Sequence, residues 1–171
     1  KCDAIPLLRD LELADYAKTV VDVCLHTIQH ADKKFCRVDQ MCCLYSTSPL
    51  RTADDIRATV KLLHPGYCDF SMAVTHFDLN PIQALVSIGE KRLKPRWPDL
   101  IGDPDANKVN YTVDNGSTYA VSVDAFKVAR SFYGPTLRGH LMSKNHSTDI
   151  NDQADFDRAV WLAKDLFQGQ Q

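Results

Sequence analysis

Two histidines and a cysteine have the types and spacing that could hold a metal ion. His26 and His30 are four residues apart, so a helix would place both side chains on one face. If segments 11–30 and 37–46 are helices that form an antiparallel hairpin, Cys42 lies opposite His26. Imidazole and thiolate are zinc ligands, so these three residues could bind zinc in a reducing compartment. Because the spacing lacks the paired Cys-x-x-Cys pattern of zinc modules, we favour a surface histidine pair and expect no zinc.

Disulfide formation is the second chemistry that the cysteines suggest. All 6 cysteines lie in the N-terminal half of the chain, which is typical of a disulfide framework. Cys24 would face Cys42 or Cys43 across the predicted helical hairpin, and we expect a disulfide there. The alternative is a set of buried thiols, which the apolar sequence around Cys24 also favours. The candidate residues are Cys2, Cys24, Cys36, Cys42, Cys43 and Cys68.

Asn-x-Ser/Thr sequences add a second sign of export. They place candidate glycosylation sites at Asn110, Asn115 and Asn145. Together with the cysteines they predict a secreted, extracellular glycoprotein, and an intracellular protein is the alternative. Lys1 would then follow a signal peptide that has been removed. Asn115-Gly116 is also a turn signal, so this sequence can serve the backbone instead of a glycan.

An acidic stretch partly matches a calcium-binding loop. Asp103, Asp105 and Asn107 have the spacing that opens an EF-hand loop, and Asp114 falls at its twelfth position. Lys108 occupies the place of the glycine that the turn of such a loop needs, and a strand pattern follows instead of a helix. We therefore interpret the stretch as an Asx-rich loop. No cofactor is expected, with zinc and calcium as the two alternatives.

The densest basic cluster is the candidate binding surface. Cations beside an aromatic ring can contact phosphates and stack on bases. The net charge of −2 gives nucleic-acid binding no wider support, and basic residues also suit the end of a predicted helix over 81–93. We expect a protein partner, with nucleic acid as the alternative. The candidate residues are Lys91, Arg92, Lys94, Arg96 and Trp97.

Catalytic motifs are absent from the sequence. It has no Gly-x-Ser-x-Gly, no glycine-rich phosphate loop and no His-Glu-x-x-His. Cys68 with His64 or His76 is a possible nucleophile and base, which leaves a Cys–His hydrolase as a further alternative. His140 and His146 lie in a polar stretch and are predicted to face solvent. We therefore predict binding without catalysis.

The elements that must position these residues are predicted to be mainly helical. Apolar residues recur at helical spacing, and Thr52 and Asp152 have the sequence pattern of N-caps. Alternating residues around Asn115-Gly116 predict one β-hairpin near 109–123. The predicted fold is α+β and predominantly α-helical, with six or seven helices, in one compact domain over residues 1–171. The predicted helices include 11–30, 37–46, 53–63 and 81–93, with a short helix over 69–76.

Composition fits a globular domain. Of the 171 residues, 44% are hydrophobic and 25% charged, which excludes a collagen, a coiled coil or a disordered chain. No apolar run approaches the roughly 20 residues that cross a bilayer, so no membrane span is expected. The combined prediction is a secreted, disulfide-clipped helical interaction domain that binds another protein.

Overall fold

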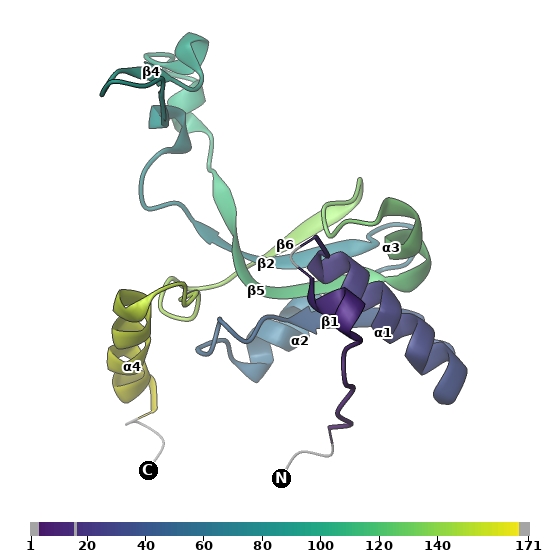
Figure 1. Ribbon diagram of the computed structural model, residues 1–171. Helices are drawn as coiled ribbons and strands as arrows, with labels where there is room; N and C mark the ends of the chain where they lie inside the picture. Colours follow the sequence, from purple (N-terminus) through teal and green to yellow (C-terminus); the bar gives the residue numbers. More distant parts are fainter. Residues whose placement is uncertain (1–3, 16, 168–171) are drawn as a thin grey trace.

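A mixed β-sheet, not a helical bundle, organises the chain (Figure 1). The computed structural model describes residues 4–15 and 17–167. The described residues contain 4 α-helices and 6 strands, and 36% of these residues are helical, 3-10 turns included, and 22% are in strands. The fold is therefore α+β. The prediction of a predominantly α-helical domain with six or seven helices is wrong.

The main sheet has 4 strands in the order β1-β5-β2-β6. They are β1 (Gln40–Leu44), β5 (Thr112–Ser122), β2 (Phe70–His76) and β6 (Leu137–Leu141). Strand β5 is antiparallel to both of its neighbours, whereas β2 and β6 are parallel. Strands β1, β2 and β6 therefore run in one direction, and their C-terminal ends meet at one edge of the sheet. We call this edge the carboxyl edge.

Several predicted helices are strands because pairing with distant residues decides their conformation. Segment 37–46 contains β1, in which Cys43 pairs with Tyr119, and segment 69–76 contains β2. These apolar runs are too short to separate helix from strand by periodicity. The predicted helical hairpin of segments 11–30 and 37–46 is therefore wrong.

The predicted helix over 81–93 is also wrong. This segment forms a single 3-10 turn at Pro81–Gln83, followed by β3 (Leu85–Ser87) and β4 (Leu93–Pro95), which pair antiparallel. The turn between the two strands contains Gly89, Glu90 and Lys91, all with positive φ. A helix cannot accommodate three consecutive residues of that conformation.

The predicted hairpin near 109–123 is one continuous strand, β5. Met72 of β2 pairs with Tyr119 of β5. Val74, two residues further along β2, pairs with Asp114, which is five residues away along β5. The intervening residues 115–118 therefore bulge out of the ladder with β2, while Thr118 still pairs with Leu44 of β1. Gly116 supplies a φ of 67° in this bulge. The Asn-Gly sequence thus marks a local bend. The chain does not reverse there, because β5 pairs with β1 along one side and with β2 along the other.

The four helices are α1 (Val20–Lys34), α2 (Ala53–Lys61), α3 (Val123–Ala129) and α4 (Gln153–Phe167). Capping boxes begin α1 at Thr19 and α2 at Thr52, where the hydroxyl accepts a hydrogen bond from an amide three residues on. The predicted cap at Thr52 is confirmed. None of the described helices is both long and apolar enough to cross a membrane.

The hydrophobic core lies between one face of the sheet and the helices α1 and α3. Gly134 packs so closely on this core that a Cβ there would lie 2.1 Å from the Phe70 ring. A smaller cluster under α4 consists of Leu50, Ala159 and Leu162. The main cluster consists of Cys24, Ile28, Phe70, Met72, Tyr119, Val121, Val123, Phe126 and Phe132.

Residues 77–111 project from the carboxyl edge as a separate arm, seen at the top of Figure 1. The arm contains β3 and β4, and it joins the sheet at the end of β2 and the start of β5. Its buried hydrophobic residues are Ile82 and Ala106. We refer to residues 77–111 as the arm below.

The predicted disulfide framework is not present among the described residues. Cys24 of α1 and Cys43 of β1 lie 3.8 Å apart, beyond the length of an S–S bond. A hydrogen bond from the Cys24 thiol lowers the pKa of Cys43, and the same contact together with burial raises the pKa of Cys24. Cys36 and Cys42 are exposed, Cys68 is buried, and Cys2 lies outside the described residues. The disulfide-clipped fold is therefore wrong.

Removing the Thr52 hydroxyl tests the cap of α2. We expect Thr52→Ala to lower the free energy of unfolding by about 1–2 kcal/mol, because the hydroxyl caps the helix and also donates to Asp55. Urea denaturation of the purified chain measures this change. Thr52→Ser keeps the hydroxyl and should retain most of the stability. Equal stabilities for the wild type and the alanine variant would contradict the assignment.

Candidate functional site

A polar cavity of about 150 Å³ opens at the carboxyl edge. In sheets with parallel strands, ligands bind beyond the C-terminal ends of those strands, because the loops there converge. Here the end of β2, the loop after β6 and the start of α4 meet in this way. We call this space the edge cavity. Its lining residues are Thr75, His76, Asp78, Lys144, Ser147, Thr148, Asp149, Asp155 and Arg158.

Two buried side-chain oxygens in the edge cavity lack a hydrogen-bond partner. They are Oγ1 of Thr148 and Oδ1 of Asp149, and neither has a hydrogen-bond partner among the described residues. Thr148 is only 7% exposed. A buried polar group left unsatisfied costs about 1–3 kcal/mol, so such groups in folded proteins need a reason. A ligand that donates hydrogen bonds would supply it.

Contacts within the chain fix Asp149 Oδ2 and the backbone around Asp149. Asn151 Nδ2 donates to Asp149 Oδ2 at 3.2 Å, and the amide of Ile150 donates to the Thr47 carbonyl at 2.8 Å. The carboxylate also packs against Gly116, where a Cβ would lie 3.4 Å from Asp149 Cγ. The carboxylate is therefore held in place with one oxygen free to accept.

The charges of the edge cavity are only partly paired. Lys144 forms an ion pair with Asp78 and holds the pKa of that carboxyl below its usual value. Asp155 accepts a hydrogen bond from the amide of Asn151 at 3.0 Å. Within the described part of the chain, Arg158 has no ion-pair partner. Asp149, with its buried Oδ1, and Arg158 both line the cavity, and neither Oδ1 nor the Arg158 guanidinium has a partner among the described residues.

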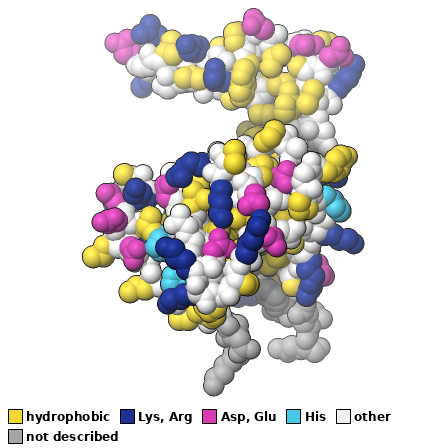
Figure 2. Space-filling model, turned by 90° about the vertical axis from the view of Figure 1, so that its right-hand side faces the viewer, with side chains coloured by type: hydrophobic (Ala, Val, Ile, Leu, Met, Phe, Trp, Pro, Cys, Tyr) yellow, Lys and Arg dark blue, Asp and Glu magenta, His cyan; other side chains and the backbone are white. Residues whose placement is uncertain are grey.

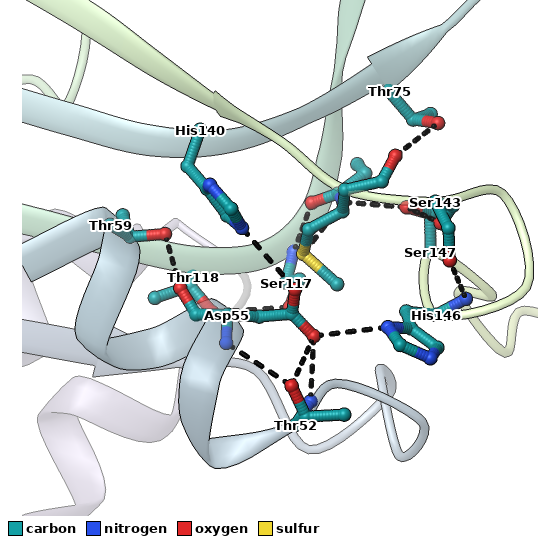
Figure 3. A network of polar contacts seen from close by, with 12 residues as sticks. Thr52, Asp55, Thr59, Thr75, Ser117, Thr118, His140, Ser143, His146 and Ser147 are labelled. Carbon is teal, nitrogen blue, oxygen red and sulfur yellow. Dashed lines mark hydrogen bonds and ion pairs between the residues drawn. The ribbon is translucent and has the colours of Figure 1, made fainter.

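A buried carboxylate ties the loop after β6 to the sheet and to α2 (Figure 3). Each oxygen of Asp55 lies 3.2 Å from a histidine nitrogen, Oδ1 from His140 Nε2 and Oδ2 from His146 Nδ1. Burial alone would raise the pKa of Asp55, but the Thr52 cap and the two histidines outweigh it and lower the pKa. His140 and His146 face this carboxylate, although the sequence predicted that they face solvent.

Further hydrogen bonds hold the same loop (Figure 3). Asn115 of the β5 bulge donates to Ser147 Oγ at 2.9 Å, and Ser147 donates to the carbonyl of Ser143 at 2.8 Å. Thr75 donates to the Met142 carbonyl at 3.3 Å. Because the loop is held from both sides, Thr148 and Asp149 are presented to the cavity by a rigid segment.

A tyrosine cluster lies on the β5 bulge. Asp114 accepts hydrogen bonds from Tyr133 at 2.6 Å and from Tyr119 at 2.8 Å. The carboxylate stabilises each neutral phenol and opposes its ionisation. The Asp114 hydrogen bond, followed by burial, raises the pKa of Tyr133 to about 12, and burial raises that of Tyr119 further. This cluster braces the bulge that Asp149 packs against.

The basic cluster predicted as a binding surface lies on the arm, away from the edge cavity. Lys91 and Arg92 belong to the turn between β3 and β4, and Arg92 lies 3.9 Å from Glu90. The Arg96 guanidinium lies 5.6 Å from the centre of the Trp97 ring. Lys94 is in β4. All five residues lie on the arm, and their role in binding stays a prediction.

The predicted metal ligands are not brought together in the described residues. His26 lies 3.8 Å from Asp10, and no group of three His, Cys, Asp or Glu side chains that includes His26, His30 or Cys42 could hold a metal ion there. In the calcium-like stretch, Asp103 Oδ1 accepts from the amide of Asp105 at 2.9 Å. That contact is typical of an Asx turn.

The predicted glycosylation sites differ in exposure. Asn115 is buried under the loop after β6, whereas Asn110 and Asn145 are exposed. The expectation of an α-helical, disulfide-bonded protein is wrong, and nothing in the structure supports secretion or glycosylation. The extracellular location of the protein stays a prediction. Cys68 is fully buried with its thiol 3.4 Å from the Phe70 carbonyl, so the geometry gives the Cys–His hydrolase no support.

Neither models of known protein families nor curated proteins match the sequence.

Replacing Asp114 tests the tyrosine cluster. We expect Asp114→Asn to bring the pKa of Tyr133 from about 12 toward its ordinary value of 10.0, because the amide carries no charge to oppose the phenolate. Tyrosine ring-carbon NMR during an alkaline titration measures the change, and Tyr133→Phe assigns the signal. An unchanged Tyr133 pKa in the asparagine variant would contradict the assigned contact.

Proposed function

We propose that this chain binds a small hydroxylated anion, such as a polyol phosphate, in the edge cavity. The observation that carries the proposal is the pair of buried oxygens of Thr148 and Asp149, which no described residue satisfies. They lie at the carboxyl edge, beside the C-terminal ends of the parallel strands β2 and β6. No nucleophile is required for this function.

The hydroxyl part of the ligand follows from the acceptor at Asp149. A carboxylate oxygen accepts but does not donate, so its partner must carry an O–H or N–H group. The Thr148 hydroxyl beside it can donate or accept. A hydrogen bond to a charged group contributes about 1.5–3 kcal/mol, so a ligand hydroxyl at Asp149 would supply much of the affinity for a small molecule.

The anionic part follows from Arg158. Its guanidinium has no ion-pair partner in the described part of the chain, and it presents a planar set of donors that suits phosphate or carboxylate oxygens. Lys144 is already neutralised by Asp78. A cavity of about 150 Å³ is smaller than the sites of drug-sized ligands, which limits the ligand to a few polar groups.

Calorimetric titration with glycerol phosphate tests the proposal, with glycerol and inorganic phosphate as partial ligands. We expect saturable binding of glycerol phosphate and weaker binding of each partial ligand. Asp149→Asn should weaken glycerol phosphate binding by about 10- to 100-fold, since it removes a charged acceptor.

A matched control separates the site from general charge. Asp157→Asn changes an exposed carboxylate on the same helix as Arg158, outside the lining of the cavity, and should leave the affinity unchanged. Arg158→Met should weaken glycerol phosphate and inorganic phosphate but not glycerol. Absence of saturable binding, or equal affinity in Asp149→Asn and the wild type, would refute the proposed function.

A further inference from the structure

The arm contains an apolar cavity that the polar edge cavity does not explain. Its volume is about 360 Å³. Sites for small molecules have volumes of roughly 300–1,000 Å³ and are lined mainly by hydrophobic and aromatic side chains. This cavity, which we call the arm cavity, therefore has the size and the lining of a small-molecule site. Its lining residues are Phe77, Pro81, Ile82, Trp97, Leu100 and Tyr111.

The side chains around the arm cavity are not all buried by the fold. Ile82 is buried, but Phe77 is 39% exposed and Trp97 is 41% exposed. Figure 2 shows hydrophobic side chains gathered on the arm, which is at the top of the view. Removing apolar surface from water is favourable, so an apolar group that fills the cavity and covers these rings would be stabilised.

Shared residues connect the arm cavity to the edge cavity. A further cavity of about 280 Å³, which we call the middle cavity, has Phe77 and Tyr111 in common with the arm cavity. It has His76, the last residue of β2, in common with the edge cavity. Asp78 of the arm also lines the edge cavity, together with Arg158 of α4. The three cavities therefore follow one another from the end of β2 into the arm.

The polarity of the lining changes along this series. The edge cavity is lined by polar and charged side chains. In the middle cavity, His76 and Asn110 have side chains that can donate a hydrogen bond, and Phe77 and Tyr111 add apolar surface. The arm cavity is lined by aromatic and aliphatic side chains. A ligand that matches all three would have a charged head, a neutral polar link and an apolar tail.

We propose that the ligand is a glycerol phosphate that carries one acyl chain. Its phosphate and free hydroxyl occupy the edge cavity, its ester carbonyl accepts a hydrogen bond from His76 or Asn110, and its chain enters the arm cavity. A flexible chain suits this path because it can follow the shared residues from His76 past Phe77. The inference rests on the proposed function, since it extends the ligand of the edge cavity.

Calorimetric titration with ligands of increasing chain length tests the inference. The ligands are glycerol phosphate, butanoyl glycerol phosphate and octanoyl glycerol phosphate, each below the concentration at which it forms micelles. Affinity should rise roughly fourfold for each methylene that enters the arm cavity, which gives the octanoyl ligand an advantage of about 100-fold over glycerol phosphate. Because each ligand is monomeric, the gain reports one bound molecule and not a lipid surface.

A matched pair of variants locates the chain. Leu100→Trp fills the arm cavity and should bring the affinity for the octanoyl ligand close to that for glycerol phosphate. Ile101→Trp places the same side chain on the next residue, which is 50% exposed and does not line the arm cavity, and should keep the full gain. Both variants should bind glycerol phosphate as the wild type does, which also shows that they are folded.

Fluorescence of Trp97 gives a second readout. Trp97 and Trp161 are the 2 tryptophans of the chain, so Trp161→Phe leaves Trp97 as the single reporter. The octanoyl ligand should move the emission of this variant to shorter wavelengths, because the chain displaces water from the ring. Glycerol phosphate should leave the emission unchanged, because it does not reach the arm cavity.

The outcomes separate this inference from the proposed function. Saturable binding of glycerol phosphate with no gain from the chain, or a gain that Leu100→Trp leaves intact, would overturn the inference and leave the proposed function standing. Octanoyl binding that Asp149→Asn does not weaken would place the ligand outside the edge cavity and would also overturn the inference. Failure of glycerol phosphate itself to saturate the wild type would refute the proposed function, and this inference with it.

Discussion

The pairing of β5 with both β1 and β2 is the constraint on which the rest of the structure depends. Because β5 is antiparallel to each, β1 and β2 must run in the same direction, and β6 then joins β2 in parallel. Three chain segments therefore leave the sheet at one edge. The arm, the loop after β6 and the segment before α2 all begin there, so that edge collects polar side chains from distant parts of the sequence.

The bulge in β5 turns this arrangement into a site. It brings Asn115 under the loop after β6 and places Gly116 against Asp149. Arg51 holds the bulge from the other side by donating to the carbonyls of Tyr45 and Ser117. Asp55 fixes the far end of the loop through His140 and His146. These contacts hold the bulge and the loop after β6 in place, and a binding site needs such contacts to keep its hydrogen-bond acceptors preorganised.

Local sequence patterns predict where helices are capped, but they do not predict which strands pair in the sheet. The Thr52 cap and the start of α4 after Asp152 depend on neighbouring residues, and both are predictable. Strand β1 depends on Cys43 pairing with Tyr119, which no local pattern reports. A short apolar run without alternation fits helix and strand equally, and here the distant partner decides.

The site was unpredictable for the same reason. Asp55 and His140 are 85 positions apart, and only the sheet brings them together. The polar stretch that contains Thr148 and Asp149 has the composition of a solvated loop, and their burial under the β5 bulge has no sequence signature. The sequence instead indicates the basic cluster as the binding surface, and the fold places that cluster on the arm.

A backbone amide NMR titration of the chain with glycerol phosphate locates the ligand site directly. We expect saturable shifts confined to the loop from Met142 to Ile150, the end of β2 and the first turns of α4. Shifts that centre on the arm, or no saturable shifts at all, would contradict the assignment of the carboxyl edge as the ligand site.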